Sequence, residues 1–220
     1  MKIALLNGSP KYKNSSSEIL LADLKSCILE AAKTAEDACR ETDILEITLH
    51  HGNAPPEIIQ KLESADAWVF SCPLYVDGLP GHLLSCLLQL DSVLRKKELP
   101  KTRKIFIYGI VNCGFYEGIQ AKTALEILKN WCAKTGLVYG GGIGVGGGGG
   151  LSMMSSPKPE KGPKAPIIKK LRAMADRMLR QEASENHYVS VAFPRFLYKM
   201  AAQMGWRQQI RANGKRAKDL

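Results

Sequence analysis

The sequence has six cysteines but no closely spaced pair of them, and it has no long hydrophobic run. The cysteines stand at positions 27, 39, 72, 86, 113 and 132, so the C-x-x-C motif of a zinc ribbon or an iron–sulfur site is absent. No apolar run approaches the roughly eighteen residues of a membrane span, and the initial MKIALL is too short for a signal peptide. We therefore expect a cytoplasmic protein with unpaired thiols and no membrane span.

The sequence also lacks the motifs of nucleotide hydrolysis and of acid–base catalysis. It contains no G-x-x-x-x-G-K-[ST] motif. A G-x-G-x-x-G match at Gly142, Gly144 and Gly147 lies inside a glycine run with no helix after it, and we discount it as low complexity. The four histidines, at positions 50, 51, 82 and 187, form no recognisable triad or metal site. No side chain is therefore assigned as catalytic, and no metal is expected.

Net charge is absent from most of the chain. Residues 1–156 hold 16 Lys and Arg against 16 Asp and Glu, whereas residues 157–220 hold 15 against 5, so the formal charge of +10 belongs to the last 64 residues. A hydrophobic content of 45% excludes wholesale disorder. Because a nucleic-acid-binding core would carry positive charge on its folded surface, the neutral first part does not favour nucleic acid as a partner.

Short apolar runs alternate with segments of helical periodicity along the chain. The predicted strands are 1–6, 44–49, 67–71, 104–111 and 137–145, and the predicted helices are 19–31, 56–62, 80–94, 118–134, 167–185 and 194–212. This alternation predicts a doubly wound α/β fold, a five-stranded parallel sheet with helices on both faces. We place one domain at 1–186, with a Gly/Pro-rich loop at 140–166, and a basic helical C-terminal extension at 187–220.

Ligands of such sheets bind beyond the carboxyl ends of the strands, so the loops there are the candidate site. The loop after the first strand, residues 7–18, reads NGSPKYKNSSSE, and Ser15 with Glu18 spells a capping box at a helix start. Free amides, hydroxyls and the positive end of a helix dipole suit a phosphate. A serine-rich helix cap without a ligand is the alternative, which we consider weaker for a loop with so many hydroxyls.

The loops after the third and fourth strands are aromatic and rich in accessible backbone. Residues 71–81 read SCPLYVDGLPG, and residues 112–117 read NCGFYE. A phosphate site beside two such loops would suit a flat aromatic ring carried on a phosphorylated stem. The alternative for Tyr75, Phe115 and Tyr116 is ordinary packing at the ends of the sheet.

The motifs NGSP, CPLYVDGLPG and NCGFYE resemble those of the NAD(P)H-dependent FMN reductases and related flavodoxin-like flavoproteins, over roughly residues 1–145. The resemblance implies a flavodoxin-like strand order of 2-1-3-4-5, FMN as the cofactor of the 1–186 domain and NAD(P)H as cosubstrate. Lys11 stands where many members carry arginine, which keeps the charge but loses the two-pronged hydrogen bond. Some members have a cysteine-rich insert for an iron–sulfur cluster, and this chain has none.

The resemblance also implies which residues contact FMN. The phosphate would be held by Ser9, Lys11, Asn14, Ser15 and Ser16. The isoalloxazine ring would lie against Pro73, Leu74, Tyr75, Val76, Asp77 and Gly78 on one side and Asn112, Cys113, Gly114 and Phe115 on the other. The flavin would then carry the chemistry, so the protein needs no catalytic acid or base.

Three functions remain open from the sequence. The leading one is an FMN-dependent NAD(P)H oxidoreductase that passes electrons to a quinone, nitro compound, flavin or protein acceptor. An FMN-binding electron carrier without nicotinamide activity is the second, although such carriers are typically small and acidic and this chain is basic, at 24.2 kDa. The third is an anion-binding module whose basic tail holds nucleic acid or a membrane surface, since residues 187–220 have seven Lys and Arg against one acid.

The tail has a second interpretation, as an assembly element. Its apolar residues recur at helical spacing, which is how a helix packs on its own domain or on a second subunit. The residues concerned are Phe193, Phe196, Leu197, Met200, Ala201 and Met204. We therefore expect a homo-oligomer, a dimer or a tetramer. Residues 193–213 also resemble the C-terminal extension of some clostridial-type members of the same family.

Overall fold

A single parallel sheet of six strands organises the chain in the computed structural model, which describes residues 1–34, 42–97, 103–154 and 159–216. The strands lie in the order β2-β1-β3-β4-β5-β6, and every neighbouring pair is parallel. Their bounds are β1 (Lys2–Asn7), β2 (Asp43–Thr48), β3 (Ala67–Pro73), β4 (Phe106–Asn112), β5 (Val138–Val145) and β6 (His187–Val189). The predicted doubly wound α/β fold is confirmed.

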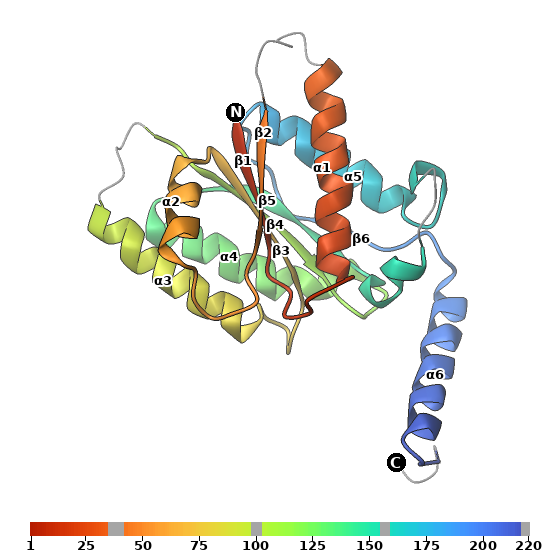
Figure 1. The fold of residues 1–220 in the computed structure, drawn as a ribbon. Helices are drawn as coiled ribbons and strands as arrows, with labels where there is room; N and C mark the ends of the chain where they lie inside the picture. The colour runs from red at the N-terminus through yellow and green to blue at the C-terminus, as the bar shows by residue number, and fades with distance from the viewer. Residues whose placement is uncertain (35–41, 98–102, 155–158, 217–220) are drawn as a thin grey trace.

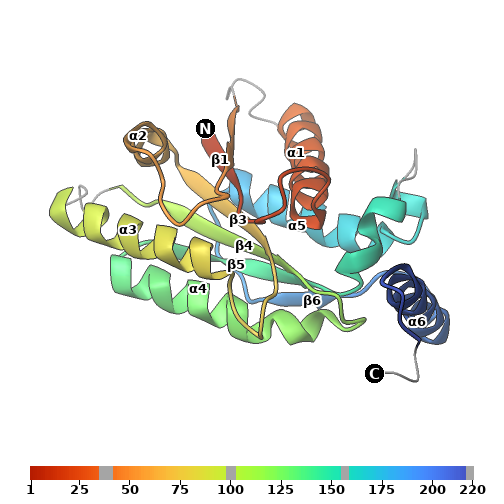
Figure 2. The same cartoon turned by 60° about the horizontal axis from the view of Figure 1, so that its bottom comes forward.

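Helices cover both faces of the sheet (Figures 1 and 2). On one face lie α1 (Ser16–Thr34) and α5 (Ala165–Leu179), which contact each other. The other face carries α2 (Pro56–Ser64), α3 (Gly81–Lys97) and α4 (Lys122–Thr135), the last preceded by the 3-10 turn η1 (Gly118–Ala121). In the described ranges, no helix combines the length and hydropathy needed to cross a membrane.

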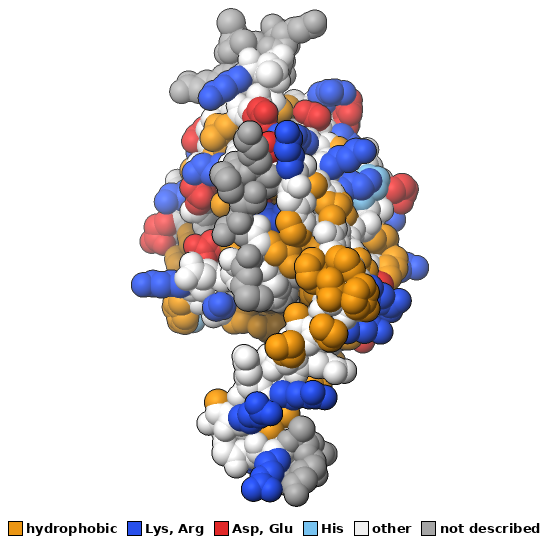
Figure 3. Space-filling view, turned by 90° about the vertical axis from the view of Figure 1, so that its right-hand side faces the viewer, with side chains coloured by type: hydrophobic (Ala, Val, Ile, Leu, Met, Phe, Trp, Pro, Cys, Tyr) orange, Lys and Arg blue, Asp and Glu red, His pale blue; other side chains and the backbone are white. Residues whose placement is uncertain are grey.

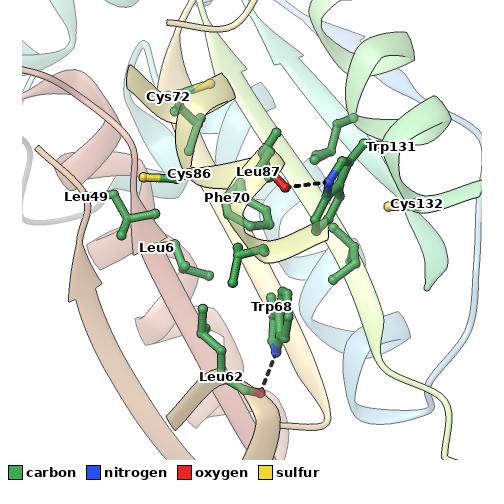
Figure 4. Close-up of a cluster of buried hydrophobic side chains, with 14 of the residues drawn as sticks. Leu6, Leu49, Leu62, Trp68, Phe70, Cys72, Cys86, Leu87, Trp131 and Cys132 are labelled. Carbon is green, nitrogen blue, oxygen red and sulfur yellow. Dashed lines mark hydrogen bonds between the residues drawn. The ribbon is translucent and has the colours of Figure 1, made fainter. Parts of the chain in front are cut away.

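Two hydrophobic cores, one on each face, follow from the alternation of side chains along the strands. In β1, Ile3 and Leu5 belong to the core under α1 and α5, whereas Leu6 belongs to the core under the other three helices. That second core contains two buried tryptophans (Figure 4). The indole N–H of Trp68 donates to the carbonyl of Leu62 at 2.9 Å, and that of Trp131 donates to the carbonyl of Leu87 at 3.0 Å. Each polar indole atom is therefore satisfied inside the core.

The strand β5 is rich in glycine because backbone from other segments lies directly against it. A Cβ on Gly144 would come within 2.5 Å of the carbonyl oxygen of Gly118, and one on Gly146, just past the strand, would overlap the carbonyl oxygen of Tyr116. The strand predicted at 137–145 is confirmed, and residues 140–145 belong to it and not to the loop predicted at 140–166. The glycines are there for close approach, not for flexibility.

The sheet has one strand more than predicted, because β6 pairs with the last three residues of β5. The predicted order of the first five strands is correct, but residues 187–189, placed in a helical extension, form an edge strand. A strand of three residues gives too short a pattern to detect in the sequence. The helix predicted at 167–185 also ends earlier, at Leu179, and the chain turns at Gln181, whose φ is 54°.

The last helix, α6 (Arg195–Ala212), projects from the body of the domain (Figure 1). None of its eighteen residues, all of them described, is buried. Hydrophobic side chains gather where the helix leaves the domain, and Lys and Arg side chains lie along its outer part (Figure 3). Large apolar side chains are exposed along it, at Phe196, Met200, Met204 and Trp206.

Candidate functional site

The loops after β1, β3 and β4 are joined to one another at the carboxyl edge of the sheet. The amide of Gly8 donates to the carbonyl of Ser71 at 2.8 Å, which connects the first loop to β3. The amide of Leu74 donates to the carbonyl of Asn112 at 2.7 Å, which connects the second loop to β4. The sequence-predicted site residues are therefore all brought to one edge.

The loop after β1 is fixed from inside by its own polar groups. Ser9 is buried, its amide donates to the side-chain oxygen of Asn7 at 3.1 Å, and its hydroxyl oxygen accepts from the amide of Lys11 at 3.2 Å. The ring of His50 contacts the Ser9 carbonyl through Nδ1 at 3.0 Å. The backbone of this loop is thus held in one shape before any ligand binds.

The start of α1 has the geometry of an anion site. The amide of Glu18 donates to the hydroxyl of Ser15 at 3.1 Å, and the amide of Ser15 donates to the carboxylate of Glu18 at 3.3 Å, so the predicted capping box is present. The next amides, of Ser16 and Ser17, stand in the first turn and have no intrahelical acceptor. Lys11 adds a cation, because its ammonium donates to the carbonyl of Asn14 at 3.2 Å. Amides, hydroxyls and the positive charge of Lys11 therefore converge here, beside the carboxylate of Glu18.

The loop after β3 is a tight hairpin with an unusual backbone. Tyr75 and Gly78 exchange two amide-to-carbonyl hydrogen bonds of 3.1 and 3.0 Å around a two-residue turn. The turn residues have positive φ angles, 47° at Val76 and 57° at Asp77, where Asn and Gly are the favoured residues. The side chain of Val76 is fully exposed, and Tyr75 is half exposed. The loop thus holds a strained β-branched residue at its tip.

We predict that Val76→Asn raises the free energy of unfolding by about 1 kcal/mol, because Asn tolerates a left-handed backbone and the exposed valine loses no burial. Urea unfolding of the two proteins measures the difference. Gln181, with a φ of 54°, is a matched position outside these loops, and Gln181→Asn should shift stability in the same direction. Equal stability of Val76→Asn and wild type would mean that the valine is not strained.

The loop after β4 begins with a side chain that points inward. The buried amide of Asn112 donates to the hydroxyl of Ser17 at 2.9 Å and to the carbonyl of Cys72 at 3.0 Å. The Nδ2 amide of Asn112, one of the predicted site residues, therefore ties β4 to α1 and β3. Further along, Gly114 is exposed, with no atom within 4 Å of a Cβ placed there, and Phe115 is 57% exposed. The outer part of this loop faces open space.

A fourth segment, the turn after β5, completes the edge and was missed in the sequence. It includes the 3-10 turn η2 (Gly148–Met153). The amides of Gly147 and Gly148 donate to the carbonyls of Phe115 and Cys113, at 2.6 and 2.7 Å. The hydroxyl of Ser16 donates to the carbonyl of Gly148 at 2.6 Å, which connects this turn to the start of α1. The glycine run was the available signal, and its length made it look like low complexity.

The thiols and imidazole of this edge are held neutral. Burial raises the pKa of Cys72 to about 12 and also raises the pKa of Cys113, so neither thiol is a ready nucleophile. Burial lowers the pKa of His82, although the carbonyls of Gly8 and Leu49 oppose that shift.

In the described ranges, no three His, Cys, Asp or Glu side chains gather as metal ligands would. The five described cysteines are unpaired and buried, and Cys39 lies outside the described residues.

A cavity of about 470 Å³ lies elsewhere, at the start of β5, between Lys129, Tyr139 and residues 183–186. The hydroxyl of Tyr139 donates to the side-chain oxygen of Asn186 there, at 2.7 Å. Tyr139 is the second residue of β5, whereas the loops described above follow the last residues of their strands. This cavity is therefore not part of the loop edge.

The doubly wound sheet and the loops at its carboxyl edge define a flavodoxin-like protein. The family model described as NADPH-dependent FMN reductase matches residues 1–133, which is more than half of the chain. The chain therefore belongs to this family of FMN-dependent oxidoreductases.

Solved structures show the same fold at low sequence identity. An NADH:FMN oxidoreductase in its apo form has a TM-score of 0.56 and 14% identity, over 84% of this chain and 91% of that one. An FMN-dependent NADH-azoreductase from Bacillus anthracis in complex with FMN has a TM-score of 0.55 and 16% identity, over 80% and 98%. A Streptococcus pneumonia flavodoxin has a TM-score of 0.50 and 11% identity, over 82% and 99%. No curated protein sequence matches this chain.

Proposed function

We propose that this protein binds FMN at the carboxyl edge of the sheet and transfers electrons from NAD(P)H to a quinone, nitro compound, flavin or protein acceptor. The observation that carries the proposal is the convergence of a polar helix start and two exposed aromatic loops at one edge. Membership of the FMN reductase family supports the cofactor. The azoreductase of the same fold was solved with FMN bound, which also favours it.

The phosphate of FMN would be held at the start of α1. The first-turn amides of Ser16 and Ser17, the positive end of the helix dipole and the ammonium of Lys11 are the groups that an anion needs. We assign the phosphate site to Ser9, Lys11, Asn14, Ser15 and Ser16. Ser9 and Ser15 are buried and act mainly by fixing the loop, whereas Lys11 and Asn14 are exposed.

The isoalloxazine ring would lie between the loops after β3 and β4. The first of these loops would contribute residues 73–78 and the second would contribute residues 112–115. The exposed rings of Tyr75 and Phe115 and the open space at Gly114 leave room for a flat aromatic group with backbone at its edge. The side-chain nitrogen of Asn112 is already bonded to Ser17 and Cys72, which leaves its backbone and its side-chain oxygen for the ring.

The chemistry available here would come from the flavin, which accepts a hydride and passes on one or two electrons. The residues of the chain would bind, orient and shield it. The thiols of Cys72 and Cys113 stay protonated because they are buried, so neither acts as a nucleophile beside the flavin. No side chain is assigned a catalytic role.

We expect Ser16→Glu to weaken FMN binding by at least about tenfold, because a carboxylate at the helix start repels the phosphate. Titration of apo-protein with FMN, followed by flavin fluorescence, measures the affinity. Ser26→Glu is the matched control, since Ser26 is exposed on the same helix and its hydroxyl donates only to the carbonyl of Ala22. Ser16→Ala separates the charge from the loss of the bond to Gly148. Equal FMN affinity of Ser16→Glu and Ser26→Glu would rule out this phosphate site.

Stopped-flow mixing of the FMN-loaded protein with NADH and with NADPH tests the enzymatic part of the proposal. Bleaching of the flavin absorbance by either nucleotide supports an oxidoreductase that uses it as cosubstrate. Binding of FMN without reduction by either would favour an electron carrier. A protein that takes up no FMN would contradict both and leave the anion-binding module.

Assembly as a homo-oligomer remains part of the proposal. The apolar side chains exposed on α6, among them Phe196, Met200 and Met204, are the feature that supports it. Light scattering of the purified protein distinguishes a monomer from a dimer or a tetramer.

A further inference from the structure

We propose that the first turn of α6 is a positioning element of the flavin site, in which Tyr198 and Arg195 hold the loop after β4 from its outer side. The role assigned to the loop rests on the proposed function. The contacts between α6 and the loop are present whether or not the protein binds FMN. They give the basic extension a task within its own domain, in addition to any task at a subunit interface.

Four contacts join the start of α6 to residues 114–117. The hydroxyl of Tyr198 donates to the carbonyl of Gly114 at 2.7 Å, although 84 positions separate the two residues in the chain. Arg195 forms an ion pair with Glu117 at 2.5 Å. The hydroxyl of Tyr116 donates to the carbonyl of Phe193 at 2.9 Å, and the rings of Tyr116 and Tyr198 lie 5.7 Å apart. The loop and the helix start are therefore mutually bonded.

These contacts matter because the rest of the loop is held only on its inner side. The carbonyls of Cys113 and Phe115 accept from amides of the turn after β5, whereas the carbonyl of the residue between them, Gly114, points to α6. Gly114 has no side chain to restrict it and no atom within 4 Å of a Cβ placed there. Without the hydroxyl of Tyr198, the peptide after Gly114 would lose its partner and its fixed direction.

The hydroxyl of Tyr198 stays protonated and can therefore donate its hydrogen bond. Burial and the nearby thiol of Cys113 raise the pKa of the Tyr198 phenol, so the hydroxyl keeps its proton throughout the neutral range. The bond to Gly114 is therefore independent of pH under ordinary conditions.

The position of α6 indicates that its start holds the loop after β4 and does not simply pack on the domain surface. No residue of the helix is buried, and among the described residues its hydrogen bond and its ion pair to the domain come from Tyr198 and Arg195 in the first turn. The helix projects from the domain (Figure 1), and side chains further along it, such as Met204 and Trp206, are exposed. The polar contacts that Arg195 and Tyr198 make with the domain both go to the loop assigned to the isoalloxazine ring.

The test is Tyr198→Phe, which keeps the ring contact with Tyr116 and removes only the hydroxyl. We expect FMN binding about three- to tenfold weaker, in proportion to one lost hydrogen bond, together with a shift in the visible absorbance maxima of the bound flavin. Trp206→Ala is the matched control, because Trp206 is on the same helix and 74% exposed. The spectral shift distinguishes positioning of the ring from a loss of general stability, which would leave the bound flavin unchanged.

Hydrogen–deuterium exchange of the apo-protein supplies a readout that does not require FMN. Faster exchange of the amides of Gly147 and Gly148, which donate to carbonyls of the loop after β4, in Tyr198→Phe but not in Trp206→Ala would support the outer contact even if the proposed cofactor were wrong. Unchanged exchange of these amides would overturn the contact. Faster exchange combined with wild-type FMN affinity and spectrum would overturn its role in the flavin site.

The ion pair offers a second, independent variant. Arg195→Met and Glu117→Gln should each weaken FMN binding, and the double variant should weaken it no more than either one alone, because both remove the same contact. Additive effects would mean that the two side chains do not act together on the loop.

Discussion

Replacing Gly146 by alanine is expected to lower the free energy of unfolding by about 3 kcal/mol and to abolish tight FMN binding. A Cβ at this position would overlap the carbonyl oxygen of Tyr116 and lie 2.7 Å from the amide nitrogen of Gly118. Both atoms belong to backbone, which cannot move aside as a flexible side chain can. The displaced segment includes the loop after β4, so stability and the flavin site should be damaged together.

Urea unfolding and FMN titration of Gly146→Ala measure the two effects. Gly149→Ala is a close control, because Gly149 lies in the same glycine run and a Cβ there would meet nothing within 4 Å. It should differ from wild type by less than about 0.5 kcal/mol. Equal stability of the two variants would contradict the close approach of η1 to the end of β5.

Replacing Lys164 by methionine is expected to cost about 3 kcal/mol of stability, because it leaves a carboxylate without its partner. Lys164 is buried at the start of α5 and forms an ion pair with Asp23 of α1, whose side chain is 18% exposed. The pair connects the two helices on this face, and α1 also carries the proposed phosphate site. The double variant Asp23→Leu with Lys164→Met should recover most of the loss, since it removes both charges.

Recovery of stability in the double variant would show that the loss in Lys164→Met comes from the unpaired carboxylate of Asp23 and not from lost packing of the lysine. Lys25→Met serves as the control, because Lys25 pairs with Glu46 at the surface and such pairs contribute about 0–1 kcal/mol. Thermal unfolding of the four proteins gives the comparison. A double variant as unstable as Lys164→Met alone would show that packing of the lysine stem, not the charge, holds α5 in place.

Most of the fold could be predicted because its strands and helices have strong local signals. Buried parallel strands such as 67–73 are mostly apolar runs, and Gly136, which caps the end of α4, adopts a positive φ of 76°. The strand β5 was predicted at 137–145, but the partners of its glycines could not be predicted, because Gly144 lies against backbone at Gly118, more than twenty positions away in the chain. The same holds for β6, whose three residues are fixed by pairing with β5.

The candidate site was predicted in its loops but not in its internal bonding. Loop motifs show which backbone is exposed, yet nothing in NCGFYE shows that Asn112 turns inward to Ser17 and Cys72. The contact of Tyr198 with Gly114 joins residues 84 positions apart and has no local pattern at all. Sequence periodicity identified α6 as a helix, and only the tertiary structure shows where that helix meets the domain.

The glycine run at the end of β5 contains positions with opposite tolerance to mutation. At Gly144 and Gly146 any side chain collides with backbone, whereas at Gly149 a methyl group meets open space. Compositional filters treat such a run as uninformative and would mask these residues together. In a library of variants of this protein, we expect depletion at the first two positions and free substitution by small residues at the third, so a stretch of repeated glycine can hold some of the least replaceable residues of a domain.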